Sequence, residues 1–182
     1  MNGQYSIKGY IYQSLVALLD SFESDWESIC VEPNDESEKV DIRWNYPDGK
    51  IIVVQVKSSK NTFSLSSIKN WAKELIDSTP NASEYKLVLI GNVAANVNDK
   101  IENVIIENKN MSIDDFQSII MQKINSFFEH NGKTAISTKL CRLFAQALNH
   151  KILENSVTGK VVLRDEFKKY LLDSFSAIED QL

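Results

Sequence analysis

The stretch Ile51-Ile52-Val53-Val54-Gln55-Val56-Lys57-Ser58-Ser59-Lys60 decides the fold. Its first half is a continuous apolar run rich in β-branched residues, which predicts a strand that is buried on both faces and central in a sheet. Gln55 and Lys57 interrupt this pattern, and because they are two residues apart they point to the same face. A lysine is rarely fully buried without a partner. The end of this strand is therefore the first candidate for a functional site.

A second strand precedes this one and predicts a hairpin with it. Residues 40–46 alternate, with Val40, Ile42, Trp44 and Tyr46 on one face and Asp41, Arg43 and Asn45 on the other. Pro47-Asp48-Gly49 is a turn signal. A two-residue Asp48-Gly49 turn would pair Asp41 with Val56, whereas a three-residue Pro47-Asp48-Gly49 loop would pair Asp41 with Gln55. Only the second register, or an equivalent bulge, brings Asp41 to the face of Gln55 and Lys57.

The rest of the chain predicts an α/β fold, in which a mixed central sheet is flanked by helices. Helices are expected at residues 8–22 (after a loose end at 1–7), 66–78, 112–130, 138–152 and 164–178, and further strands at 28–32, 85–90 and 104–106, the last an edge strand. The order strand, helix, strand over residues 51–90 favours a parallel pair. Ser112 and Asp115 have the spacing of a capping box. We expect an α/β core at 1–107 and a helical C-terminal region at 108–182, packed on the core or serving as an interface.

Composition narrows the cellular setting. No apolar run approaches the length of a membrane span, and the N-terminus lacks the basic-then-apolar pattern of a signal peptide. Cys30 and Cys141 are not clustered, which is typical of reduced thiols in the core of a cytosolic protein. We therefore expect a cytoplasmic protein with no membrane partner.

The charges are distributed unevenly, although the chain as a whole carries a net charge of -5. Acidic residues crowd the segment 20–48, and none occurs between Lys50 and Lys73. Lys60, Lys69 and Lys73 lie in that acid-free window, and a local basic patch is what contact with nucleic-acid phosphates requires. The alternative for such lysines is an ordinary solvated face.

The residues around Lys57 are those that hydrolysis of a phosphodiester needs. A divalent cation is held by oxygen ligands, and one of its waters becomes the nucleophile. Asp41 offers a carboxylate, Gln55 an amide oxygen and Val56 a backbone carbonyl, while Lys57 is a fixed cation for the developing phosphoryl charge. Glu32, at the end of the preceding strand, adds a second carboxylate. The spacing alone is common, so a strand end with solvated polar tips is the competing interpretation.

The same residues resemble the PD-(D/E)XK nuclease superfamily. The motifs are Gly9-Tyr10-Ile11-Tyr12-Gln13 in a first helix, then Glu32, then Val40-Asp41-Ile42, then Val54-Gln55-Val56-Lys57-Ser58-Ser59. The pattern is similar to the nuclease domain of CD-NTase-associated (Cap4-like) anti-phage effectors and to Mrr-like restriction endonucleases, which have Gln-x-Lys in place of an acid before the lysine. The resemblance covers roughly residues 8–91.

This resemblance implies a restriction-endonuclease-like core and cleavage of DNA that depends on Mg²⁺ (or Mn²⁺). It implies that Asp41 and Gln55 hold the metal, that Lys57 is the catalytic cation and that Glu32 is an accessory acid. Gln13 and Ser58 match positions close to the site in the family.

Two hypotheses of different classes remain at this stage. The first is a DNA endonuclease of bacterial anti-phage defence, which works with a separate sensor or NTPase subunit, or as a homodimer because both strands must be cut. The second is a catalytically idle subunit with the nuclease fold, which binds nucleic acid or a protein partner. The neutral Gln55 keeps the second hypothesis open, because it leaves one carboxylate fewer for the metal.

Overall fold

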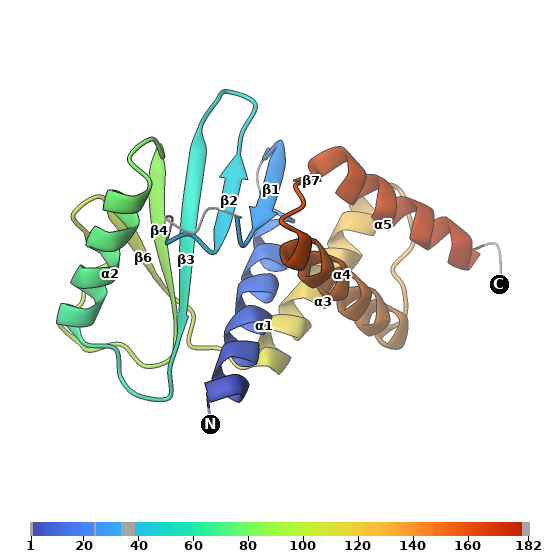
Figure 1. Ribbon diagram of the computed structural model, residues 1–182. Helices are drawn as coiled ribbons and strands as arrows, with labels where there is room; N and C mark the ends of the chain where they lie inside the picture. Colours follow the sequence, from blue (N-terminus) through green and yellow to red (C-terminus); the bar gives the residue numbers. More distant parts are fainter. Residues whose placement is uncertain (1, 24, 34–38, 180–182) are drawn as a thin grey trace.

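The computed structural model describes residues 2–23, 25–33 and 39–179, with side chains for residues 7–177 of these. In this part of the chain a mixed seven-stranded sheet has the order β5-β6-β4-β3-β2-β1-β7, and helices cover both of its faces (Figure 1). Helix α2 lies on one face, whereas α1 and the C-terminal helices lie on the other (Figure 1). The predicted fold class, a mixed sheet flanked by helices with a helical C-terminal region, is confirmed.

The elements have the following bounds. The strands are β1 (Ser28–Val31), β2 (Ile42–Asn45), β3 (Ile51–Ser58), β4 (Glu84–Ile90), β5 (Lys100–Ile101), β6 (Val104–Asn108) and β7 (Val162–Leu163). The helices are α1 (Asn2–Asp20), α2 (Leu65–Ser78), α3 (Ile113–His130), α4 (Thr138–Thr158) and α5 (Arg164–Glu179).

Strand β3 is central and buried on both faces, as its sequence predicts. Val54 and Val56 belong to the hydrophobic core that α1 covers, and Val53 belongs to the core that α2 covers. On its other edge β3 runs parallel to β4, with Gln55 opposite Leu87. The crossover through α2 therefore joins a parallel pair, as expected.

The β2–β3 hairpin adopts the register that the site hypothesis requires. Asn45 pairs with Ile51, and the Tyr46 amide donates a hydrogen bond to the Lys50 carbonyl at 3.0 Å, so residues 47–49 form a three-residue loop. Counted back along this register, Asp41 would stand opposite Gln55, but the pairing ends at Ile42 and Val54.

The alternation predicted for residues 40–46 is wrong at its first position. Val40 packs in the core under α2, whereas Ile42 and Trp44 pack in the core under α1. The Asp41 amide donates to the Val54 carbonyl at 3.0 Å, and Ile42 is the register partner of the same Val54. Two residues thus face one, which is the pattern of a β-bulge and reverses the side-chain alternation there.

Two other local predictions are corrected. Residues 2–7 belong to α1 and are no loose end. The apolar spacing that begins at residue 8 marks the part of α1 that packs on the core. It does not show where the first turn of the helix begins. Strand β6 is not the edge, because β5 pairs with it on its outer side; a two-residue strand is too short to show a periodic pattern.

The C-terminal helices share a hydrophobic core with α1 and the sheet. Phe116 of α3, Leu148 of α4 and Leu171 of α5 are buried in the same cluster as Leu15 of α1. The capping box at Ser112 and Asp115 is present. The boundary between residues 107 and 108 and a role for these helices as an interface stay predictions, but the helices pack on the core.

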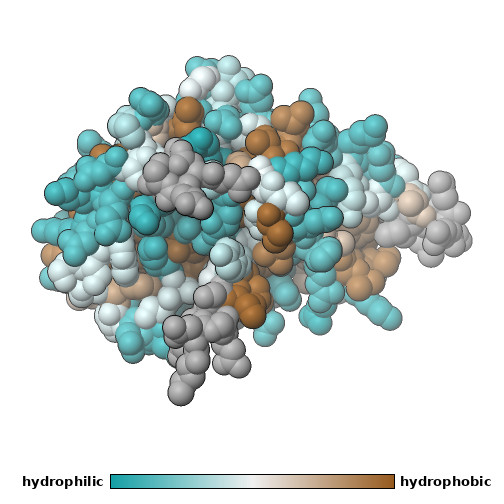
Figure 2. Space-filling model, viewed as in Figure 1, coloured by the Kyte–Doolittle hydropathy of each residue, from teal (hydrophilic) through white to brown (hydrophobic). Residues whose placement is uncertain are grey.

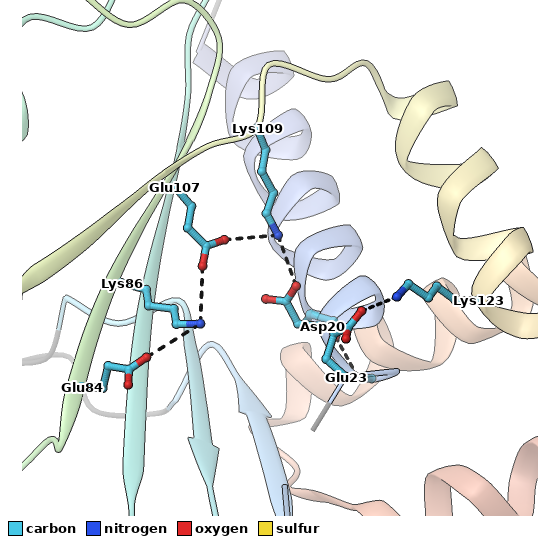
Figure 3. Close-up of polar contacts among 9 residues, drawn as sticks. Asp20, Glu23, Glu84, Lys86, Glu107, Lys109 and Lys123 are labelled. Atoms are coloured by element: carbon cyan, nitrogen blue, oxygen red, sulfur yellow. Dashed lines mark hydrogen bonds and ion pairs between the residues drawn. The ribbon is translucent and has the colours of Figure 1, made fainter. Parts of the chain in front are cut away.

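A chain of ion pairs ties the end of α1 to strands β4 and β6 (Figure 3). Lys86 bridges Glu84 at 3.8 Å and Glu107 at 3.4 Å, and Lys109 bridges Glu107 at 3.4 Å and Asp20 at 3.2 Å. Burial raises the pKa of Asp20 although Lys109 opposes the shift. The network fixes the C-terminal end of α1 over the sheet, on the helix that also carries Gln13.

Gly91, which follows β4, lies very close to the backbone at Ser59, which follows β3. Its φ is +144°, and a Cβ atom there would lie 2.5 Å from the Ser59 carbonyl oxygen. We expect Gly91→Ala to lower the free energy of unfolding by about 3 kcal/mol, because it adds a backbone clash to conformational strain. Gly132→Ala is the control, since φ there is +72° with open space around the new methyl group; it should lose about 1 kcal/mol. Equal losses in urea unfolding would contradict the clash.

Candidate active site at the open edge of β3

Strand β3 extends past the ends of its neighbour β2 and of β1 beyond it, and the candidate site lies in the gap. Val31, Ile42 and Val54 are paired across β1, β2 and β3, and β3 then continues to Ser58 alongside β4 only. The Val56 amide, which has no strand to pair with on this edge, donates to Asp41 Oδ2 at 2.6 Å. The carbonyl of a strand residue points to the same edge as its amide, so Val56 also offers an oxygen to this gap.

Glu32 lies beside Asp41 in the gap. It follows β1 directly, and its amide donates to the Asp41 carbonyl at 2.8 Å. Its φ is +50°, in the left-handed region that few non-glycine residues adopt. Such backbone strain occurs often at functional sites, where the surrounding structure holds a side chain in place.

The two carboxyl groups both have a raised pKa. Burial raises the pKa of Asp41, although the Val56 amide, the Lys57 ammonium and the Gln13 amide oppose the shift. Burial also raises the pKa of Glu32, and the neighbouring charge of Asp41 adds to the rise. Hydrogen bonding by the Gln13 amide lowers the pKa of both groups. The structure therefore brings together Gln13 of α1, Glu32 after β1, Asp41 before β2 and Lys57 of β3.

Two amide oxygens in this region are buried without a hydrogen-bond partner. They are Gln55 Oε1 and Gln13 Oε1, on side chains that are 3% and 9% exposed. An unpaired buried acceptor costs about 1–3 kcal/mol of desolvation, so a bound water or ion is one explanation for each of them. Gln55 shares the α2 face of β3 with Val53 and Lys57, which leaves its oxygen as an acceptor that the described protein does not satisfy.

Trp71 is a site residue that the sequence did not reveal. The Lys57 ammonium lies 5.7 Å from the centre of the Trp71 ring, within the range of a cation–π contact. Phe63 packs against the edge of that ring. Nothing in the sequence links positions 57 and 71 before the crossover is folded.

The remaining predicted residues lie around this gap. Ser58 is exposed at the end of β3, and Lys60 is exposed in the loop that follows. Lys69 and Lys73 are exposed one helical turn apart on α2, on the face of the sheet that carries Lys57. Their contacts with DNA, and an accessory role of Ser58, stay predictions.

The described residues contain no group of three or more histidine, cysteine, aspartate or glutamate side chains placed to hold a metal ion. The gap offers two carboxylates, an amide oxygen and a backbone carbonyl instead. In the described part of the chain no helix is long and apolar enough to cross a membrane.

The fold is similar to solved structures, although no protein-family model and no curated protein sequence matches the chain. The Cap4 SAVED/CARF-domain containing receptor of Moraxella osloensis aligns with a TM-score of 0.63 and 10% identity over 92% of this chain. The Acinetobacter baumannii Cap4 receptor, in its structure with the cyclic trinucleotide 3′3′3′-cAAA, aligns with a TM-score of 0.65 and 14% identity over 95% of this chain.

These alignments cover only 48% and 46% of the two receptors. The chain thus spans just under half the length of the Cap4 receptors that it matches. At such low identity the likeness establishes a shared fold with one part of these receptors.

The raised pKa of Asp41 sets the pH dependence of stability. The folded carboxyl keeps its proton to a higher pH than the unfolded one, whose pKa is 3.8, so stability falls as the pH rises through this interval and stays lower above it. Asp41→Asn removes this destabilisation and still accepts the Val56 hydrogen bond. We expect the variant to be more stable than wild type at pH 7 and equal to it below pH 3.8, as measured by urea unfolding.

The exposed Asp99 provides the control for this comparison. Asp99→Asn should leave the difference in stability between acid and neutral pH as it is in wild type. If Asp41→Asn destabilised the protein at pH 7, burial would not be the dominant influence on the pKa of Asp41.

Proposed function

We propose that the protein is a metal-dependent DNA endonuclease that hydrolyses phosphodiester bonds at the open edge of β3. The observation that carries this proposal is the Asp41 carboxylate that accepts a hydrogen bond from the Val56 amide at 2.6 Å, with the Glu32 carboxyl and the Lys57 ammonium close enough to shift pKa values in the gap. Carboxylate, amide and carbonyl oxygens are the ligands that Mg²⁺ and Mn²⁺ prefer. The donor set therefore fits a hard divalent cation.

Each residue has a defined task in this proposal. Asp41, whose Oδ2 accepts from the Val56 amide, would hold the metal together with Gln55 Oε1 and the Val56 carbonyl. Glu32 adds negative charge or holds a water of the metal. The metal, when bound, lowers the pKa of a water that attacks phosphorus and neutralises charge on the phosphate.

Lys57 supplies the fixed positive charge of the site. Its ammonium lies over Trp71 and close enough to Asp41 and Glu32 to lower the pKa of both. A cation held there stabilises the charge that develops on the phosphoryl oxygens. Trp71 limits the positions that the lysine side chain can take.

A role in bacterial anti-phage defence is proposed from the likeness to the Cap4 receptors, together with the resemblance of the Gln-x-Lys motif to Cap4-like nucleases. A nuclease of this kind needs a sensor, either as another part of a longer chain or as a separate subunit. The second hypothesis, an idle subunit with the nuclease fold, predicts nucleic-acid or protein binding without cleavage.

Cyclic oligonucleotide recognition is another candidate function, because Acinetobacter baumannii Cap4 receptors are seen with the cyclic trinucleotides 2′3′3′-cAAA and 3′3′3′-cAAA. Calorimetric titration with both compounds separates it from nuclease activity. Binding to the isolated chain would favour a sensor, whereas absence of binding combined with cleavage would favour the nuclease.

Plasmid cleavage tests the catalytic residues. We expect supercoiled DNA to be cut in Mg²⁺ and to stay intact in EDTA. Asp41→Ala and Lys57→Ala should each lower the rate at least about 100-fold, because they remove a metal ligand and the fixed cation. Gln55→Glu should retain activity that Gln55→Ala loses. Cleavage that is unchanged in Asp41→Ala and Lys57→Ala would exclude this site.

Metal binding has a readout that does not depend on activity. Mg²⁺ should raise the thermal midpoint of wild type, because a ligand that binds only the folded state stabilises it, and should leave that of Asp41→Ala unchanged.

The lysines of α2 make a separate prediction about DNA affinity. A lysine that contacts a phosphate contributes about one unit to the slope of log affinity against log salt. We expect Lys69→Ala and Lys73→Ala each to lower that slope by about one and to weaken binding of all sequences alike. Lys139, which is exposed on α4, is the matched control. If the slope were the same in all three variants, the α2 lysines would be a solvated face that does not contact DNA.

A further inference from the structure

An apolar groove opens beside the candidate site, between α1 and the end of α4. It has a volume of about 460 Å³, and Ile7, Tyr10 and Ile11 of α1 face Leu153 and Val157 of α4 across it. Three of these side chains are unusually exposed for their type, at 62% for Ile7, 50% for Tyr10 and 87% for Val157. Figure 2 shows hydrophobic side chains gathered on this face, over α1 and the end of α4. Exposed apolar surface of this kind marks a binding site more often than chance.

The groove is continuous with the candidate site. Glu32 lines the groove and also lies beside Asp41. Tyr10 is three residues before Gln13 on α1, so both side chains lie on the same side of the helix. A protein seated in the groove would cover Glu32 and obstruct the site, whereas part of the substrate would occupy groove and site in one binding event. Because the groove continues into the candidate site, a portion of the substrate suits it better than a protein partner does.

The charges of the groove indicate which portion. Among the described residues that line it, Glu32 is the only charged one, and none is a lysine or an arginine. Such a surface is unfavourable for phosphates but suits a planar, neutral base, whose exocyclic amino group can donate to a carboxylate. Lys69 and Lys73 lie on α2, across the sheet from α1, where they suit the phosphate backbone.

We propose that this groove binds an unpaired nucleobase of the substrate strand, next to the phosphate at Asp41, with Tyr10 as the stacking surface. The inference rests on the proposed nuclease function and deepens it: the substrate must be single-stranded at this position, or have one base turned out of the duplex. Base–aromatic stacking tolerates any base, because every base has a π-face. Tyr10 then positions the strand and does not take part in the chemistry.

The test measures binding in a chain that cannot cut. The full chain carrying Lys57→Ala is titrated with single-stranded deoxythymidine oligonucleotides that contain one 2-aminopurine, placed at successive positions. Stacking on Tyr10 should quench the 2-aminopurine fluorescence at one position of the bound strand. Adding Tyr10→Ala should abolish this quenching and weaken binding about tenfold, whereas Tyr10→Phe should preserve both.

Two further variants separate the groove from its surroundings. Val157→Asp adds a negative charge to the groove and should weaken binding as much as Tyr10→Ala. Leu143→Ala is the matched control, because Leu143 is 54% exposed on α4 but does not line the groove. Tyr10, Val157 and Leu143 are each at least half exposed, so the fold should be retained in these variants, which thermal unfolding checks.

The outcomes distinguish this inference from the proposed function. Quenching that depends on Tyr10, in a protein whose wild type does not cleave, supports the groove and refutes the nuclease. Cleavage with equal oligonucleotide affinity in Tyr10→Ala and wild type refutes the groove and leaves the nuclease standing. Absence of oligonucleotide binding also refutes the groove. A change in self-association on Tyr10→Ala, measured by sedimentation, without a change in oligonucleotide affinity, would show instead that the groove is an interface between copies of the chain.

Discussion

The hydrogen bond between the Val56 amide and the Asp41 carboxylate is the interaction on which the site depends. β3 runs past the ends of β1 and β2, so part of its backbone faces a gap in the sheet, and backbone groups there must find partners. Asp41 supplies one at 2.6 Å, with a side chain where another strand would have supplied a carbonyl. Because this side chain takes the place of a neighbouring strand, a carboxylate lies in the plane of the sheet. Gln13 reaches it from α1, and Lys57 lies near it on the strand that it caps.

The gap is energetically unfavourable in several ways at once. Two carboxyl groups are partly desolvated, two amide oxygens lack partners, and Glu32 has a left-handed backbone. The two hydrophobic cores that enclose the sheet offset these costs, since stability is a small difference between large terms. In the proposed nuclease, a bound cation would offset the desolvation of the carboxyl groups, because it needs oxygen ligands. This pattern fits a site selected for binding better than it fits an ordinary strand end.

Sequence reasoning found the features that depend on local spacing. The Pro47-Asp48-Gly49 loop fixed the hairpin register, and the apolar run from Ile51 to Val56 located the central strand. It failed where distant segments decide the outcome. The bulge at Asp41 moves Val40 to the other core, and the contact of Trp71 with Lys57 exists only once α2 has crossed the sheet. The left-handed Glu32 has no sequence signal, because glutamate is not a residue that favours that conformation.

The C-terminal helices bear on the site through α1. Gln13 and Tyr10 lie on this helix, and its buried side shares a core with α3, α4 and α5. Tyr12 and Phe116 of α3 are in tilted ring contact there, with their ring centres 6.0 Å apart. The ion pairs at Asp20 fix its far end to β4 and β6. The end of α4 also forms one wall of the groove beside Glu32. A displacement of the helical region would therefore move the Gln13 amide and the groove relative to Asp41, while Gln55 and Lys57 stayed on the sheet. The packed helices are therefore a contiguous physical link between the C-terminal region and the site.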